Sequence, residues 1–303
     1  MKKVLIASFS IALFSAASCT KPKESVSGTY SSLATVFSDI APKSKITIID
    51  AAAGGSFYGN SGVRYVFPPN SFRTATGGTV TGNVSIQTTE YLSKSDMILS
   101  GVLPISNGQP LISGGESYIK ASQGNTELFM AAGKNYTINF PQKSTPLAGM
   151  GLFFSPGNPT ATDNVNWALN VDSSKGEILY HGDTISIFGD SMHFVNADQF
   201  FTSPNYQSFT VIPKVNGKPV SAQILAYASF DNYNSAWTMR NISNGIIGED
   251  HVPDMPVHFI VITNLDNRFY AGVLAATPLT GKVYEMPLTE MTPTALKGIL
   301  DAL

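Results

Sequence analysis

Alternation of apolar and polar positions is the main pattern in this chain. In one run Val80, Val84 and Ile86 share a parity, and Thr, Asn, Ser and Gln occupy the positions between. A period of two puts apolar side chains on one face of a half-buried β-strand, whereas an amphipathic helix needs them three and four residues apart. Upstream, Pro68 and Pro69 end the preceding strand, because proline donates no ladder hydrogen bond and fixes φ. The pattern predicts a β-sandwich domain.

Further short strands are predicted in both halves of the chain, separated by turns rich in Gly and Asn. We expect the strong turn dipeptide Asn216-Gly217 to join the runs 210–215 and 222–227 as a hairpin. A second hairpin is expected between the runs 257–263 and 268–274. Many short strands with almost no helix are typical of sandwiches.

Helical spacing of apolar residues is found near the N-terminus, within residues 31–41, and at the C-terminal end. There, Thr292 as N-cap and Pro293 at the first helical position predict a short helix. We expect its apolar face to pack on a sheet; that face consists of Leu296, Ile299, Leu300 and Leu303.

The predicted fold is therefore all-β, with two β-sandwich (immunoglobulin-like) domains and a short C-terminal helix. The 43% of hydrophobic residues in 303 positions supply enough apolar surface for two cores. We predict five parts: a signal peptide at 1–18, a lipidated tether at 19–26, a first sandwich at 27–143, a β-rich connecting region at 144–207, and a second sandwich with the helix at 208–303.

The N-terminus has the layout of a secretory signal. Lys2 and Lys3 precede an apolar run that is too short for a membrane span, and small residues follow it. Cys19, the only cysteine, comes directly after these small residues and resembles the cysteine of a bacterial lipobox, which is lipidated. The alternative is an ordinary signal peptide with a chance cysteine. A lipid on Cys19 would make the membrane a partner, and no disulfide or cysteine metal site would then be available.

Charge narrows the classes of partner. The net charge is −2 and no basic stripe is visible, so we expect no nucleic-acid partner. The residues after Cys19 are basic and polar rather than acidic. We therefore expect anchoring to the outer membrane, with the periplasmic side slightly favoured over the cell surface.

Several segments resemble the N-terminal domain of a group of uncharacterised Bacteroidota lipoproteins. They are residues 67–72 (FPPNSF), 80–86 (VTGNVSI), 96–101 (DMILSG) and 111–116 (LISGGE). More loosely, the apolar-Pro-Pro motif resembles that of ZU5-type β-sandwiches. The resemblance implies a β-sandwich fold and an exported location, and it implies no known activity.

The second half carries the same resemblance with departures. The run 194–200 reads FVNADQF, whereas in that group it reads more like WINCDRF. Phe194, Ala197 and Gln199 thus replace Trp, Cys and Arg, so a role tied to that cysteine or arginine does not carry over. The layout after residue 208 weakly resembles the immunoglobulin-like regulatory domains attached to carboxypeptidases.

One short motif suggests catalysis. Gly189-Asp190-Ser191 follows a predicted strand and resembles the nucleophile block of GDSL-type hydrolases. Its only Asp-x-x-His partner is His193 in the same turn, which cannot act as an independent base on Ser191. We predict a β-turn capped by Asp190 and Ser191, and assign no catalytic residue and no cofactor.

Two histidines and two aspartates are candidate metal ligands. His181, Asp183, Asp190 and His193 would converge if the strand between them folded back. Their spacing matches no zinc motif, so we predict surface loops and no metal site.

The run 230–237 interleaves aromatic residues with amide and carboxylate groups. Sugar-binding surfaces combine a flat aromatic ring with planar hydrogen-bonding side chains, so Tyr233, Trp237, Asp231 and Asn232 are candidate ligand-binding residues. Core aromatics flanking a polar turn would look the same. We expect a non-enzymatic envelope protein with a binding or structural role and a glycan or protein partner. The alternatives are a carbohydrate-binding surface lipoprotein and, third, a GDSL-like serine hydrolase.

Overall fold

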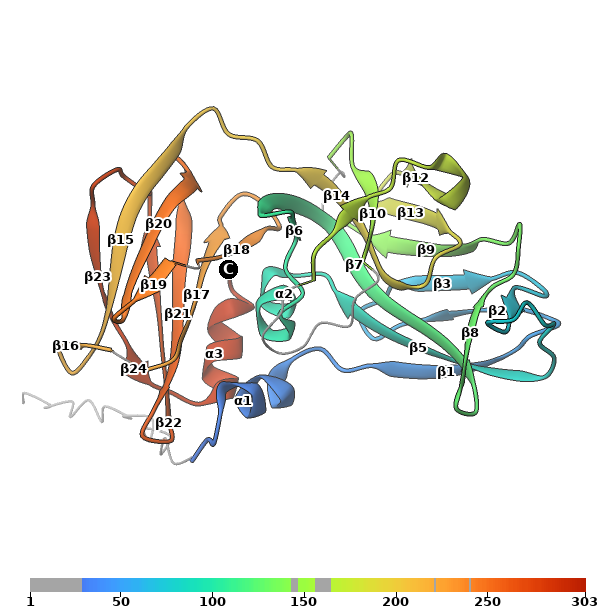
Figure 1. The fold of residues 1–303 in the computed structure, drawn as a ribbon, viewed down its shortest axis with the longest axis horizontal. Coiled ribbons are helices and arrows are strands. Elements are labelled where there is room, and N and C mark those ends of the chain that lie inside the picture. The colour runs from blue at the N-terminus through green and yellow to red at the C-terminus, as the bar shows by residue number, and fades with distance from the viewer. Residues whose placement is uncertain (1–28, 143–146, 156–164, 221, 240) are drawn as a thin grey trace, which may run out of the picture.

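The structure is a computed structural model that describes residues 29–142, 147–155, 165–220, 222–239 and 241–303. Two β-sandwiches lie side by side with three short helices between them (Figure 1). The predicted all-β class and the C-terminal helix are confirmed. The predicted signal peptide and Cys19 lie outside the described residues.

The first sandwich packs a large sheet against a five-stranded sheet. The main path of the large sheet is β1 (Lys45–Asp50), β5 (Asn83–Tyr91), β7 (Gln109–Gln123), β14 (His193–Phe200), β10 (Gly151–Ser155) and β11 (Ala168–Leu169), with β4 (Phe72–Arg73), β6 (Ile105–Ser106) and β8 (Thr126–Met130) beside it. The second sheet runs β12 (Gly176–His181), β13 (Thr184–Gly189), β9 (Tyr136–Pro141), β3 (Arg64–Phe67) and β2 (Gly55–Tyr58). The region that we expected to connect the domains therefore supplies strands to both of these sheets.

Strand alternation builds the first core. Val84 and Ile86 on β5 point inward against Tyr65 and Phe67 on β3, and all four are buried. The hydroxyl groups of Tyr65 and Ser117 lie 2.7 Å apart, which gives the buried phenol a hydrogen-bond partner. β3 ends directly before the two prolines, as expected.

The second sandwich again has two sheets. One contains β16 (Lys218–Pro219), β15 (Tyr206–Val215), β20 (Ile246–Pro253) and β19 (Asn241–Ser243), with β23 (Val283–Pro287) parallel to β15. The other runs β18 (Ala236–Thr238), β17 (Ile224–Phe230), β21 (Val257–Leu265), β22 (Arg268–Ala276) and β24 (Thr289–Glu290).

One predicted hairpin of this sandwich is confirmed and the other is wrong. β21 and β22 pair as expected, around Asp266 and Asn267 in the left-handed region that such tight turns require. Asn216-Gly217 does form a turn, but it leads into β16 and not into β17, which belongs to the opposite sheet. The turn determines the pairing of only the residues next to it. Pro219 then ends the ladder, because it has no N–H to donate.

Three helices share a core between the sandwiches. α1 (Leu33–Ile40), α2 (Lys94–Ser100) and α3 (Pro293–Leu300) pack there through buried apolar residues, with a single 3-10 turn, η1 (Ser173–Lys175), elsewhere in the described chain. Ile260 and Ile262 of β21 point into this shared core, while Phe259 and Val261 point into the core of the second sandwich. β21 is buried on both faces, which explains why its sequence is an almost continuous apolar run.

The start of the described chain is fixed to the second sandwich. The Tyr30 amide donates to the Asn267 carbonyl at 2.9 Å, and the Asn264 side-chain amide donates to the Tyr30 carbonyl at 2.6 Å. Within the part of the chain that the structure describes, no helix is long and apolar enough to cross a membrane.

Candidate functional site

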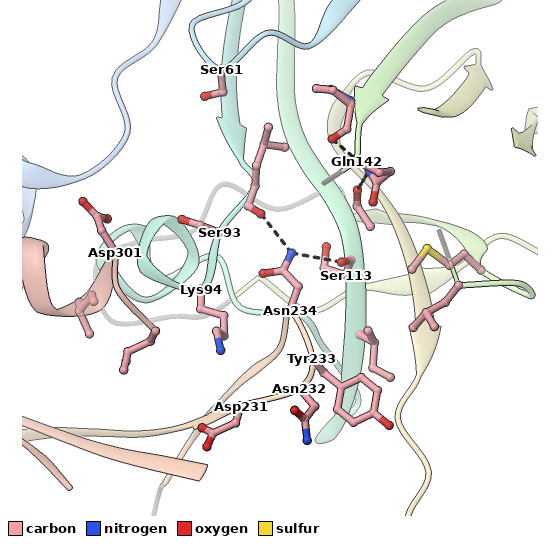
Figure 2. A pocket seen from close by; sticks show the side chains of 18 residues that line it. Ser61, Ser93, Lys94, Ser113, Gln142, Asp231, Asn232, Tyr233, Asn234 and Asp301 are labelled. Carbon is pink, nitrogen blue, oxygen red and sulfur yellow. Dashed lines mark hydrogen bonds between the residues drawn. The ribbon is translucent and has the colours of Figure 1, made fainter. Parts of the chain in front are cut away.

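A cleft of about 600 Å³ lies where the two sandwiches meet (Figure 2). The start of α2, the early part of β7, the loop 231–234 and the end of α3 border it. Its lining consists of Ser61, Leu92, Ser93, Lys94, Ile112, Ser113, Gly114, Pro141, Gln142, Leu147, Met150, Asp231, Asn232, Tyr233, Asn234, Leu300, Asp301 and Leu303. Polar and apolar groups from both sandwiches thus face one space, as in many small-molecule sites.

Asn234 fixes one wall of the cleft. Its side-chain amide donates to the carbonyls of Leu92 and Ser113, both at 3.1 Å. The Ser113 amide in turn donates to the Asn234 carbonyl at 2.9 Å. These three hydrogen bonds tie the loop of the second sandwich to the first, so the cleft is held by hydrogen bonds as well as by the shared core.

Lys94 is the charged residue deepest in the lining. Its side chain extends from α2 towards the loop that carries Asp231 (Figure 2), and the residue is only 8% exposed. Its Nζ donates to the Phe230 carbonyl at 2.9 Å. Burial lowers the pKa of the Lys94 ammonium, and the Asp231 carboxylate nearby acts in the opposite direction.

Three of the four residues predicted to bind a ligand line this cleft. Asp231 and Asn232 are exposed, and Asp231 Oδ1 lies 2.6 Å from Nδ1 of His258. The half-buried Tyr233 ring packs edge-on against Phe201 with the ring centroids 5.3 Å apart. The cleft therefore offers an amide, a paired carboxylate and one edge of an aromatic ring.

Trp237 occupies a different position from its predicted companions. It lies on β18 opposite Ala228 of β17, half-buried against the core of the second sandwich, and is not among the lining residues. The carbohydrate hypothesis expects Tyr233 and Trp237 to be exposed together as a flat platform. This expectation is wrong, because the apolar core of the second sandwich partly covers both rings.

A pair of buried carboxylates lies behind the cleft wall. Glu116 on β7 and Asp198 on β14 are both fully buried, and the Asn196 side-chain amide donates to both, to Glu116 at 3.4 Å. Burial, together with the Asp198 charge, holds the pKa of Glu116 well above its usual range, and burial does the same for Asp198. Ser113 of the cleft lining donates to Asn196 Oδ1 at 3.4 Å, which links the pair to the cleft.

The Gly-Asp-Ser segment does not bring a histidine onto its serine in the described structure. Ser191 Oγ donates to Asp190 Oδ1 at 3.0 Å. The His193 ring is instead engaged by Glu127 of β8, with Nε2 2.6 Å from Oε1. Asp190 also forms an ion pair with Lys175 at 3.5 Å.

The histidine and carboxylate groups considered for a metal lie apart. His181 pairs with Thr184 at one end of the β12–β13 hairpin, whereas Gly189, next to Asp190, pairs with Gly176 at the other end. The strand between them is about 17 Å long. Across the described ranges, no three histidine, cysteine or acidic side chains are grouped so that they could hold a metal ion.

Comparison with known proteins identifies no family for this chain. No family model matches the chain, and no curated protein matches it. The resemblance to Bacteroidota lipoproteins and to ZU5-type domains stays a prediction from the sequence.

Proposed function

We propose that this protein is a lipid-anchored component of the cell envelope that binds a small polar ligand between its two sandwiches without transforming it. The observation that carries the proposal is the cleft, in which loop 231–234 and the start of α2 present polar groups from two sandwiches to one space of about 600 Å³. A concave site at a domain junction with a few convergent polar groups is the usual form of a ligand pocket.

The envelope location rests on the sequence. A basic start, a short apolar run and small residues before Cys19 favour export followed by lipidation. The basic and polar residues after Cys19 favour the periplasmic side of the outer membrane. The test is metabolic labelling with radioactive palmitate. We expect label on the wild-type protein and none on Cys19→Ser; label on both would contradict lipidation at Cys19.

A glycan is the ligand class that the loop composition favours. Asn232 supplies a planar amide that makes no hydrogen bond within the described part of the structure, and the Tyr233 ring lies next to it in the lining. Such groups bind sugar hydroxyls and sugar faces. A protein partner or a structural role is the alternative outcome of the binding test.

The test is calorimetric titration of residues 20–303 with a panel of glycans and peptidoglycan fragments. We expect saturable binding that Asn232→Ala weakens by about tenfold, the usual effect of losing one or two hydrogen bonds. Asn135→Ala removes an exposed asparagine from the turn between β8 and β9, outside the cleft, and should leave affinity unchanged. Absence of binding across the panel, or binding indifferent to Asn232, would point to the structural or protein-partner role.

A further inference from the structure

We propose that the ligand carries a carboxylate and that Lys94 is the group that binds it. The inference rests on the proposed function and names the chemical class of the ligand. The Lys94 ammonium group lies in the cleft lining and most of its hydrogen-bonding capacity is unused. The fold alone does not account for this feature.

Lys94 has three N–H donors, and the described structure gives Nζ one acceptor, the Phe230 carbonyl at 2.9 Å. No carboxylate in the described residues lies within ion-pair distance of Nζ. Placing a charge where it is 8% exposed costs free energy unless it is paired. The unused donors are therefore suited to an anionic group that enters the cleft.

The other charged groups in the described part of the lining already have partners. Asp231 pairs with His258 at 2.6 Å, and Asp301 pairs with Lys297 at 2.7 Å. Lys94 is thus the lining charge without a side-chain counterion in the described structure. An incoming anion would neutralise it without breaking an existing pair.

The same two carboxylates limit how much negative charge the ligand can bring. A dianionic phosphate at Lys94 would meet like charge from Asp231 and Asp301 across the cleft, whereas a single carboxylate carries half that charge. Among the described residues the lining also contains no arginine, the side chain best shaped for bidentate phosphate binding. These features favour a monoanionic carboxylate on an otherwise neutral, hydroxylated molecule.

A matched pair of probes tests this directly. N-acetylmuramic acid differs from N-acetylglucosamine by a lactyl ether that carries a carboxylate. We expect calorimetry to show about tenfold tighter binding of the acid, since a charge-assisted hydrogen bond contributes about that much, and the preference should shrink as salt is raised. Lys94→Met should abolish the preference, and Lys134→Met, in the turn after β8, should keep it.

Because Lys94 is buried, a second variant is needed to separate a loss of binding from a loss of the fold. Lys94→Arg keeps the charge and should retain part of the preference, with the fold of each variant checked by circular dichroism. Equal affinity for both sugars, still dependent on Asn232, would overturn the carboxylate proposal and leave the proposed function standing. If neither N-acetylmuramic acid nor muramyl dipeptide binds the wild-type protein, the carboxylate proposal is wrong, and the neutral glycans of the panel then decide the proposed function.

Discussion

In the β7–β14 pair Glu116 lies opposite Asn196, and the Asn196 side-chain amide donates to both Glu116 and Asp198. Two ionised carboxylates in a fully buried space would repel strongly, so the pair is expected to keep a proton at neutral pH. The unfolded chain has no such constraint, and its carboxylates ionise near pH 4. The pair therefore couples folding to pH.

The sign of that coupling follows from the raised pKa values. Below about pH 4 both carboxylates are protonated in either state, and the pair costs nothing. As pH rises towards the folded-state pKa, the unfolded state loses protons first, so the free energy of unfolding falls. Each unit by which burial raises a pKa corresponds to about 1.4 kcal/mol. We expect urea denaturation of Asp198→Asn to show a smaller fall in stability between pH 5 and pH 8 than wild type.

A surface carboxylate is the control for that experiment. Asp39→Asn removes an exposed acid from α1, and its stability curve should run parallel to that of wild type. If the Asp198→Asn curve is also parallel to wild type, the pair is not the source of the pH dependence.

Only some residues of the candidate site can be predicted from the sequence. The loop 231–234 is predictable because its polar and aromatic residues are adjacent in the chain. Lys94, Ser113 and Asn234 come from three distant segments, and only the docking of the sandwiches brings them together. Glu116 and Asp198 likewise gave no signal, because the bulge that puts Asp198 opposite Ser113 cannot be read from spacing.

At the scale of elements, strands with one buried face were predictable and elements buried on all sides were not. β5 follows the alternation of Val84 and Ile86, and α3 follows its N-cap and apolar face. α2 is not predicted by its pattern, because it is buried almost all round and its apolar run has no helical period. The usable signal was the capping box, in which Ser93 and Asp96 bond each other's backbone amides.

α3 offers a matched test of the shared core. Leu296 is fully buried between the sandwiches, whereas Ile299 on the same helix is 39% exposed. Leu296→Ala should lower the free energy of unfolding by about 2 to 5 kcal/mol, because it leaves a cavity. Ile299→Ala should change it by only about 0.5 kcal/mol. Similar losses in urea denaturation would mean that α3 does not pack as described.

The hydrogen bonds of the loop 231–234 lead to a prediction about stability. Asn234→Ala removes two hydrogen bonds and leaves the carbonyls of Leu92 and Ser113 short of a donor. We expect a loss of about 1 to 3 kcal/mol in the free energy of unfolding and weaker ligand binding. Asn135→Ala again serves as the control for stability. An Asn234→Ala variant as stable as wild type would show that the loop does not need this anchor.

At the scale of the molecule, the two sandwiches are joined by a core and not merely by a linker. The shared core takes Phe153 and Phe194 from the first sandwich and Ile260 and Phe269 from the second. Neither sandwich can unfold without exposing apolar surface of the other. Scanning calorimetry should therefore show one transition with equal calorimetric and van't Hoff enthalpies; two separated transitions would contradict this coupling.

The two hydrogen bonds that hold Tyr30 to the β21–β22 hairpin also limit how far this hairpin can lie from Cys19. Even fully extended, the chain between Cys19 and Tyr30 reaches at most about 40 Å. An acyl group on Cys19 would keep the hairpin within that reach of the bilayer. The second sandwich would then be the membrane-proximal half, and β2 and β8, at the far end of the long axis (Figure 1), would project furthest into the surrounding compartment.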